Sequence, residues 1–329
     1  MTDEIHCPQT FTKIYLTNEP RTTLWRLGWR QALRSDILNA SRRMPTTDSE
    51  QQRPITIRDL DAIEEFEMVR RLEQRVWELS DADITPLTLT IALRAAGSML
   101  IGAFDGAELI GFAFAFPSLE NGCAGFHSHM LAVDPSYREH GLGYRLKVAQ
   151  RDRALAAGVK QITWTFDPLR STNAHLNFSK LGVTCDTYKV DFYGPHTSSP
   201  LHTNGTDRMW VTWGIADARV EERLGGKDVK AEVVETLNHV QPVVSFNGDG
   251  RPLETDLHAA LSRQRLAIEI PGDIDRIERE DRDLARQWRL ATRRAFTDAI
   301  NNGFVVTEFS RSVRGNQGPG AYLLERRKE

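Results

Sequence analysis

The sequence has little cysteine, no long apolar run and almost no excess of charge of either sign. Its 329 residues include three cysteines, Cys7, Cys123 and Cys185, which lie too far apart for a disulfide framework or a metal-ligand spacing. We therefore expect a reducing, cytoplasmic environment, with each cysteine a small apolar residue rather than a nucleophile. The formal net charge is -3, whereas nucleic-acid-binding domains are usually strongly basic. This balance predicts no nucleic-acid partner.

No apolar stretch approaches the roughly 18 residues that indicate a transmembrane helix. The chain begins Met1-Thr2-Asp3-Glu4, which is acidic and lacks the basic-then-apolar order of a signal peptide. We therefore expect neither a membrane span nor a membrane partner. Hydrophobic residues make up 40% of the sequence and charged residues 26%, as is typical of a globular protein.

Composition and periodicity divide the chain into three parts. Residues 1–53 form an N-terminal extension with a polar, linker-like end. Residues 54–215 alternate between helical and strand patterns and form the main domain. Residues 216–329 begin as a charged, weakly periodic linker and arm, and they end in a β-α-β-β block that is too small to stand alone. We expect this block to pack on the main domain.

The order of elements in the main domain is β-α-α-β-β-β-α-β-α-β-β, which predicts an α/β fold with both parallel and antiparallel strand pairs. The expected strands are 55–57, 99–104, 109–116, 125–133, 161–166, 184–193 and 208–213, and the expected helices are 61–77, 86–93, 143–157 and 172–181. In the C-terminal block, strands 266–270, 304–309 and 321–324 accompany a long helix that ends at Gly303.

A glycine turn, Arg138-Glu139-His140-Gly141-Leu142-Gly143, joins the strand 125–133 to the following helix. Glycines let the backbone approach a ligand and adopt positive φ. A helix start also offers unpaired N–H groups and the positive end of its dipole. On its own, the turn is equally consistent with a phosphate site and with an ordinary loop. It lacks the lysine and serine or threonine of a P-loop and the full three-glycine spacing of a dinucleotide site.

With its surroundings, the turn resembles the GNAT superfamily of N-acyltransferases. The family's pattern is Gln or Arg, two residues, Gly, one residue, then Gly or Ala, and Arg138, Gly141 and Gly143 match it. Segments 130–135 and 173–183 resemble the family's approach to this turn and its later helix. The likeness covers residues 54 to about 214. The sequences HSHM, WTFDPL and FYG, at 127–130, 164–169 and 192–194, are also similar to a branch of predicted GNAT acetyltransferases.

The resemblance implies a GNAT-like mixed sheet flanked by helices, with the C-terminal β-α-β-β block as an extension. It also implies acetyl-CoA or another acyl-CoA as the acyl donor, with succinyl-CoA left open. Asn173 would bind the pantetheine arm or serve as the N-cap of its helix. The implied coenzyme A site comprises Leu131, Ala132, Val133, Arg138, Glu139, His140, Gly141, Leu142, Gly143, Tyr144 and Asn173.

Two histidines, His127 and His129, are the candidate catalytic bases. They stand two apart on a predicted strand and so share a face, and an ordinary pKa near 6.5 suits a histidine to relay protons. The run also resembles serotonin N-acetyltransferase, in which two such histidines serve amine deprotonation through water. A purely structural pair within the sheet is the alternative. No third ligand has the spacing of a metal site, so we expect none.

One departure concerns the general acid. Where the family helix often carries a tyrosine that protonates the leaving thiolate, this chain has Phe178. Tyr188 and Tyr193 are substitutes in principle, although strand aromatics usually serve packing, and a thiolate leaves without strict need of an acid.

Polar residues outside the histidine strand are candidates for binding the acceptor. Glu120 precedes that strand, and Asp167 and Arg170 follow the strand 161–166. The last two could instead pair with each other. Arginines on the C-terminal helix are expected to form a solvated face, unless that helix covers the cleft and binds a carboxylate. They are Arg286, Arg289, Arg293 and Arg294.

These patterns predict an acyl-CoA-dependent N-acyltransferase that acylates a small amine or amino acid by direct attack in a ternary complex. A protein or peptide N-acetyltransferase is an alternative, which the C-terminal block disfavours because it would narrow the cleft. A non-catalytic acyl-CoA-binding sensor is another, which the absent tyrosine favours and the paired histidines disfavour. The sequence leaves the oligomeric state open, a homodimer included.

Overall fold

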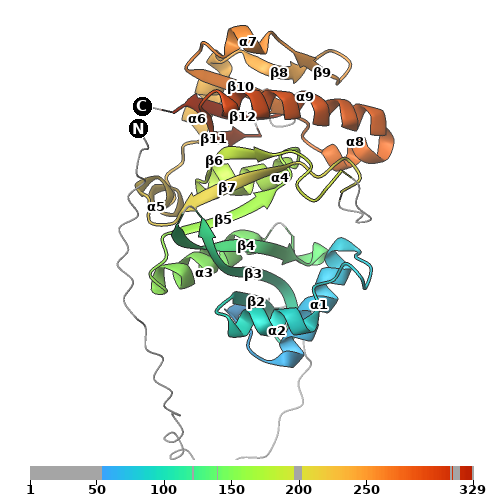
Figure 1. The fold of residues 1–329 in the computed structure, drawn as a ribbon, viewed down its shortest axis with the longest axis vertical. Coiled ribbons are helices and arrows are strands. Elements are labelled where there is room, and N and C mark those ends of the chain that lie inside the picture. Colours follow the sequence, from blue (N-terminus) through green and yellow to red (C-terminus); the bar gives the residue numbers. More distant parts are fainter. Residues whose placement is uncertain are drawn as a thin grey trace, which may run out of the picture. The chain divides into compact units, whose positions relative to one another are not determined.

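The computed structural model describes residues 54–120, 122–138, 140–195, 202–311, 313 and 319–327. The chain divides into two units, residues 1–53 and 54–329. The first unit, expected to be an N-terminal extension, lies outside the described residues, as does Glu139 of the glycine turn. The second unit contains one mixed sheet with helices on both faces (Figure 1). No described helix is both long and apolar enough to cross a membrane.

The first half of this unit follows the predicted order of elements. Its strands are β1 (Thr56–Asp59), β2 (Met99–Asp105), β3 (Glu108–Glu120), β4 (Cys123–Val133), β5 (Gln161–Phe166), β6 (Thr184–Lys189) and β7 (Arg208–Gly214). Its helices are α1 (Ile63–Trp77), α2 (Leu87–Ala95), a 3-10 turn (Pro135–Tyr137), α3 (Leu142–Ala156), α4 (Ser171–Ala174) and a π-helical segment (His175–Leu181). Strand β6 ends before its predicted limit because the chain turns at Asp191, where φ is 47°.

The second half is ordered from its beginning, and the segment expected to be a linker and arm carries helices and strands. Its elements are α5 (Ala218–Leu224), α6 (Lys230–His239), β8 (Pro242–Phe246), β9 (Pro252–Glu254), α7 (Leu257–Ala260), β10 (Arg265–Ile270), α8 (Ile274–Glu280), α9 (Arg282–Asn301), β11 (Phe304–Ser310) and β12 (Gly320–Arg326). Helices α5 and α7 have 7 and 4 residues, too few for a helical repeat to show in the sequence. Their stability comes from packing, because short helices are marginal alone.

The C-terminal block continues the sheet of the main domain rather than packing on it from outside. The twelve strands follow the order β1-β2-β3-β4-β5-β7-β6-β11-β12-β10-β8-β9. The two halves meet where β6 and β11 pair antiparallel, with Cys185 opposite Val306. The pairs β4·β5 and β8·β10 are parallel, whereas the other neighbours are antiparallel. The chain therefore has the predicted α/β fold with a mixed sheet and a C-terminal extension.

Strand order and direction repeat on the two sides of the β6·β11 junction. From outside inward, the first half reads β4-β5-β7-β6 and the second reads β8-β10-β12-β11, with matching parallel and antiparallel pairs. The crossovers differ, however. Helix α3 and its glycine turn connect β4 to β5, whereas only β9 and the short α7 connect β8 to β10. Within the described chain, a phosphate-type helix start at this crossover therefore exists only in the first half.

The strands around the predicted site are buried on both faces. Along β3, Phe112 and Phe114 pack toward α1 and α2, while Ile110 and Ala113 pack toward α3. Phe112, Ala113 and Phe114 alternate with the two-residue period of a strand. Ile110 faces α3 because it is the extra residue of a β-bulge, where Leu109 pairs with Phe104 and Gly111 pairs with Ala103. The helices α1 and α2 therefore cover the face of β2–β4 opposite to α3.

A buried ion pair ties the two halves together near the end of β5. Arg289 of α9, 2% exposed, donates through Nη2 to Asp167 over 2.6 Å and through Nε to the carbonyl of Asn204 over 2.9 Å. Burial alone would raise the pKa of Asp167, but Arg289 outweighs it and the pKa lies below its usual range. The hydroxyl of Tyr322 on β12 also donates to the Pro168 carbonyl over 2.6 Å.

We expect Arg289→Met to lower the free energy of unfolding by about 3–5 kcal/mol, because it leaves the Asp167 carboxyl buried without its partner. Arg294→Met is the matched control on the same helix, since its pair with Glu254 is about half exposed, and it should cost less than about 1 kcal/mol. Urea unfolding followed by circular dichroism measures both. Equal losses in the two variants would show that the buried pair does not join the halves.

Candidate active site

Strand β4 leaves its neighbour β5 halfway along its length. The two strands pair only at Phe126–Ile162 and His127–Thr163, whereas β4 stays paired with β3 as far as Val133. In the described chain, the second half of β4, residues 128–133, therefore has no strand partner on the β5 side. A strand edge without a partner presents free N–H and C=O groups.

The direction of the free amides follows from a single hydrogen bond. The Asp134 amide donates to the Ile110 carbonyl of the β3 side over 2.8 Å. Because alternate residues of an antiparallel strand point to opposite sides, the amide of Ala132 also faces β3. The amides of Leu131 and Val133, which the resemblance places in the coenzyme A site, then face the open side.

The glycine turn supplies an uncapped helix start close to this edge. Gly141 is the N-cap residue of α3, with φ at 67°, and no side chain caps the helix. The first backbone bond into the helix is from the Arg145 amide to the Gly141 carbonyl, at 3.1 Å. The amides of the preceding residues point out of the helix start, as in other anion sites.

Space around the two glycines is open. A Cβ at Gly141 would meet nothing within 4 Å, and one at Gly143 would meet Leu131 at 3.7 Å and Leu176 at 3.9 Å. The side chains of Arg138 and His140 are exposed, Tyr144 is half-buried, and Leu142 is buried. Leu142 therefore offers only its backbone, whereas Arg138 and His140 can contribute positive charge.

The two candidate histidines lie against the same phenylalanine. The ring centroid of Phe116 is 5.4 Å from that of His127 and 5.8 Å from that of His129. A β-bulge separates them from the end of β4, because Ala115 pairs with Ser128 while Phe114 pairs with Met130. His129 is the extra residue of the bulge and is exposed, whereas His127 is buried.

Both histidines are held in their neutral form at pH 7. Burial, together with the nearby His129 and Lys147, lowers the pKa of His127 to about 4. Partial loss of hydration also lowers the pKa of His129, although its position is exposed. A neutral imidazole keeps a lone pair that can accept a proton. The two rings are therefore ready to act as bases at neutral pH.

Glu120, expected to face the acceptor, bonds to neighbouring strands instead. Its carboxylate accepts hydrogen bonds from Thr163 and from Trp210, and Thr163 also contacts His127. Sequence reasoning missed Thr163 and Trp210. The alternation of Thr163 and Thr165 with apolar residues along β5 was a signal for a polar face, but no motif indicated which residues it would meet.

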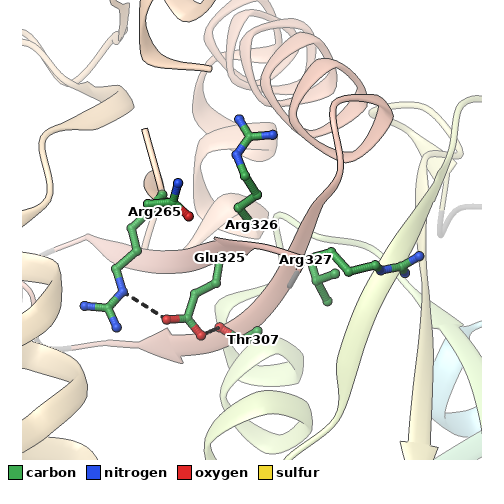
Figure 2. Close-up of a pocket in the computed structure, with 7 residues that line it drawn as sticks. Arg265, Thr307, Glu325, Arg326 and Arg327 are labelled. Atoms are coloured by element: carbon green, nitrogen blue, oxygen red, sulfur yellow. Dashed lines mark hydrogen bonds and ion pairs between the residues drawn. The ribbon is translucent and has the colours of Figure 1, made fainter. Parts of the chain in front are cut away.

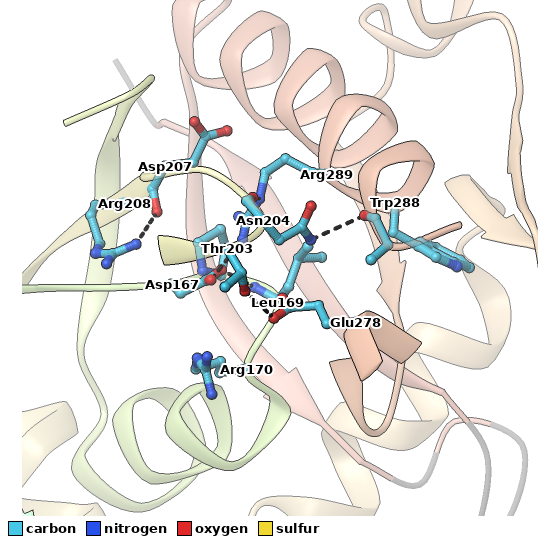
Figure 3. Close-up of polar contacts among 12 residues, drawn as sticks. Asp167, Leu169, Arg170, Thr203, Asn204, Asp207, Arg208, Glu278, Trp288 and Arg289 are labelled. Atoms are coloured by element: carbon cyan, nitrogen blue, oxygen red, sulfur yellow. Dashed lines mark hydrogen bonds and ion pairs between the residues drawn. The ribbon is translucent and has the colours of Figure 1, made fainter. Parts of the chain in front are cut away.

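The charged residues beyond β5 form ion pairs with the C-terminal half, and Figure 3 shows Asp167, Arg170 and Arg289 in this region. Asp167 pairs with Arg289, and Arg170 pairs with Asp275 over 2.6 Å. They do not pair with each other, which the sequence left open. Arg289 is buried, so the expectation of a solvated face is wrong for this arginine. Asn173 is exposed within α4, whose N-cap is Arg170, so Asn173 is not the cap.

The two tyrosines differ in their surroundings. Tyr188 donates its hydroxyl to Asp207 over 2.8 Å and stacks on Phe296, and burial raises its pKa well above the usual value. It is therefore held in a structural contact. Tyr193 lies beyond β6, is 44% exposed, and stacks on His202. Phe178 is fully buried against the C-terminal half.

A concave surface lies away from these residues, on the C-terminal half (Figure 2). Its lining is Gln264, Arg265, Val305, Thr307, Glu325, Arg326 and Arg327. Glu325 is bonded to both Arg265 and Thr307, and Arg327 pairs with Asp186. Its charges are thus largely paired, and none of the candidate residues lines it.

Comparison with solved structures returns small acetyltransferases that align with about half of this chain. One is the ribosomal-protein-S18-alanine N-acetyltransferase from Escherichia coli, with 19% identity over 50% of this chain and 96% of that one, at a TM-score of 0.40. Another is the PaiA N-acetyltransferase from Thermoplasma acidophilum, solved with coenzyme A, with 16% identity over 49% and 99%, at 0.35. A GNAT-family acetyltransferase from Streptococcus pneumoniae has 13% identity over 48% and 98%, at 0.39.

Sequence comparison gives the family assignment, because the structural likenesses are too distant to support one. No curated protein matches the chain. The model of the acetyltransferase (GNAT) family matches residues 59–182, which include β4, the glycine turn, α3 and β5. Residues 59–182 therefore form an acetyltransferase domain of the GNAT family.

Proposed function

We propose that this chain is an acyl-CoA-dependent N-acyltransferase that transfers an acetyl or succinyl group to a small amine or amino acid. One observation supports it most strongly. The edge of β4 becomes free where β5 departs, and the uncapped start of α3 follows directly after it. A free strand edge suits an amide-containing arm, and a helix start suits a pyrophosphate.

The binding residues follow from this geometry. The amides of Leu142, Gly143 and Tyr144 would hold the pyrophosphate, and those of Leu131 and Val133 would bond the pantetheine arm. Arg138 and His140 would add charge from the exposed side. When bound, the coenzyme would supply an activated thioester. Asn173 is exposed and free to contact the arm.

The histidines would supply the base. An alkylamine is mostly protonated at neutral pH, so a nearby neutral imidazole that accepts a proton speeds its attack. His127 and His129 both remain neutral at pH 7. Tyr188 is engaged with Asp207, which leaves Tyr193 as the described candidate for a general acid. Attack within a ternary complex needs no covalent residue, and none is proposed.

The acceptor is proposed to be small because the C-terminal half braces the segments around the site. Arg293 of α9 donates to Asp207 and to Asp191, both in the connection between β6 and β7. Arg289 fixes Asp167 at the end of β5. Segments that are held in place in this way around the site would admit a small molecule more readily than the surface of a folded protein.

Gly143→Trp should weaken acetyl-CoA binding by at least about 100-fold, because the indole would fill the space between Leu131 and Leu176 that the phosphates need. A smaller Cβ would make only ordinary contacts there, so Gly143→Ala is expected to fold. Ala156→Trp, at the exposed C-terminal end of the same helix, is the size-matched control. Isothermal titration calorimetry compares the three. Unchanged affinity in Gly143→Trp would remove the cofactor assignment.

His127→Ala combined with His129→Ala should lower kcat by about 100-fold at neutral pH, with acetyl-CoA affinity unchanged. The loss should shrink toward about pH 10, where the amine loses its own proton. In the wild type, protonation of His127 should add no loss of activity until the pH falls toward about 4, and any decline above that pH should come from protonation of the amine. Thiol release is measured over a panel of amines and amino acids. A variant with the wild-type pH–rate profile would contradict the base role.

The matched control removes two histidines elsewhere. His239 and His258 lie exposed on α6 and α7 of the C-terminal half, and their alanine variants should keep the wild-type profile. If the wild type binds coenzyme A but acylates no acceptor, the chain is a sensor rather than an enzyme.

A further inference from the structure

The polar groups behind His127 form one hydrogen-bond chain across neighbouring strands. Nδ1 of His127 lies 3.1 Å from Oγ1 of Thr163. The Thr163 hydroxyl donates to Oε1 of Glu120 over 2.6 Å, and Nε1 of Trp210 donates to Oε2 of Glu120 over 3.2 Å. The chain exists because His127 and Thr163 are a register pair of the parallel strands β4 and β5.

In each of these hydrogen bonds, only one of the two groups can be the donor. The indole N–H of Trp210 can only donate, so Oε2 of Glu120 accepts. The Thr163 hydroxyl has one hydrogen and gives it to Oε1, so toward the imidazole it can only accept. Nδ1 of His127 must then carry the ring hydrogen. The lone pair of the neutral ring is left on Nε2.

Two neighbouring aromatic rings hold the imidazole so that Nε2 lies on the edge without a hydrogen-bond partner among the described residues. Its centroid lies 5.4 Å from the Phe116 ring and 4.7 Å from the Trp210 ring, with tilts of 34° and 36°. Nε2 makes no hydrogen bond within the described residues. It is also not one of the described side-chain atoms that are fully buried and lack a hydrogen-bond partner. An atom sealed in this way would be of no use as a base.

We propose that Glu120 and Thr163 are positioning residues that hold His127 in the tautomer whose Nε2 removes the acceptor's proton. The proposal rests on the proposed acyltransfer. In that step the amine nitrogen bonds to the acyl carbon, the carbon–sulfur bond breaks with its electron pair on sulfur, and the amine proton passes to Nε2. The carboxylate of Glu120 holds the Thr163 hydroxyl in place, and Thr163 in turn holds the imidazolium that forms.

Replacing one carboxylate oxygen of Glu120 with an amide nitrogen tests which groups donate and which accept in these hydrogen bonds. In Glu120→Gln, the amide oxygen must accept from Trp210, which can only donate, so the amide nitrogen must face Thr163. The Thr163 hydroxyl then accepts from the amide and gives its hydrogen to Nδ1. The tautomer of His127 should therefore invert, with the hydrogen on Nε2. Long-range proton–nitrogen NMR of the full-length protein at neutral pH distinguishes the two tautomers, with His127→Gln used to assign the signals.

Two further variants serve as controls. Adding Trp210→Phe to Glu120→Gln removes the constraint on the amide, which can then turn its oxygen to Thr163 and restore the hydrogen to Nδ1. Thr163→Val removes the link and should leave a mixture of tautomers, whereas Thr163→Ser keeps the hydroxyl and should behave as the wild type. Where turnover is measurable, kcat should fall about 10- to 100-fold in Glu120→Gln and Thr163→Val, with KM for the acyl donor unchanged.

The tautomer measurement needs neither cofactor nor acceptor, so it separates this inference from the proposed function. A wild-type ring with its hydrogen on Nε2, or one unaffected by Glu120→Gln, would overturn it. So would unchanged kcat in a variant whose tautomer has inverted. Absence of thiol release by the wild type with every acceptor would instead overturn the proposed acyltransfer and with it the positioning role, while the NMR result would still establish the tautomer.

Discussion

The departure of β4 from β5 is the constraint on which the site depends. Two strands that pair over their whole length satisfy each other's amides and leave nothing for a ligand. Here the pairing ends at His127 and Thr163, so this register pair is the last that joins the two strands, and the edge of β4 is free beyond it. The bulge at His129 then turns the free end of β4 so that the apolar residues continue to alternate between the two helical layers. Catalytic and binding groups therefore lie next to each other.

The second half of the chain extends this arrangement without repeating its chemistry. It has the strand order of β4 to β7 in reverse, but a four-residue helix stands where α3 would be. Its described ion pairs hold loops of the first half in place. The buried pair Arg289–Asp167 and the bonds from Arg293 to Asp191 and Asp207 fix the loops that follow β5 and β6. Such pairs are costly to leave half-made, so they favour one arrangement of the halves.

Local patterns in the sequence predicted the fold and the position of the glycine turn before α3, because both depend on neighbours along the chain. Alternation, hairpin turns and the Gly141–Gly143 spacing are local signals. Contacts between distant segments left no such signal. Glu120 meets Thr163 across 43 residues and Trp210 across 90, and Tyr188 meets Asp207 across 19. The short elements of residues 216–263 were missed because packing on the sheet, rather than periodicity, stabilises them.

Burial keeps the imidazole of His127 neutral at pH 7, but it also makes the imidazole a weak base. A pKa of about 4 keeps the ring neutral at pH 7, but such a base holds a proton weakly and must pass it on. In the proposed reaction, Glu120 would hold the orientation of the ring through Thr163. His129 stands exposed at the bulge, against the other side of the Phe116 ring. In the proposed reaction, the buried His127 would take the proton and the exposed His129 would be placed to pass it to solvent.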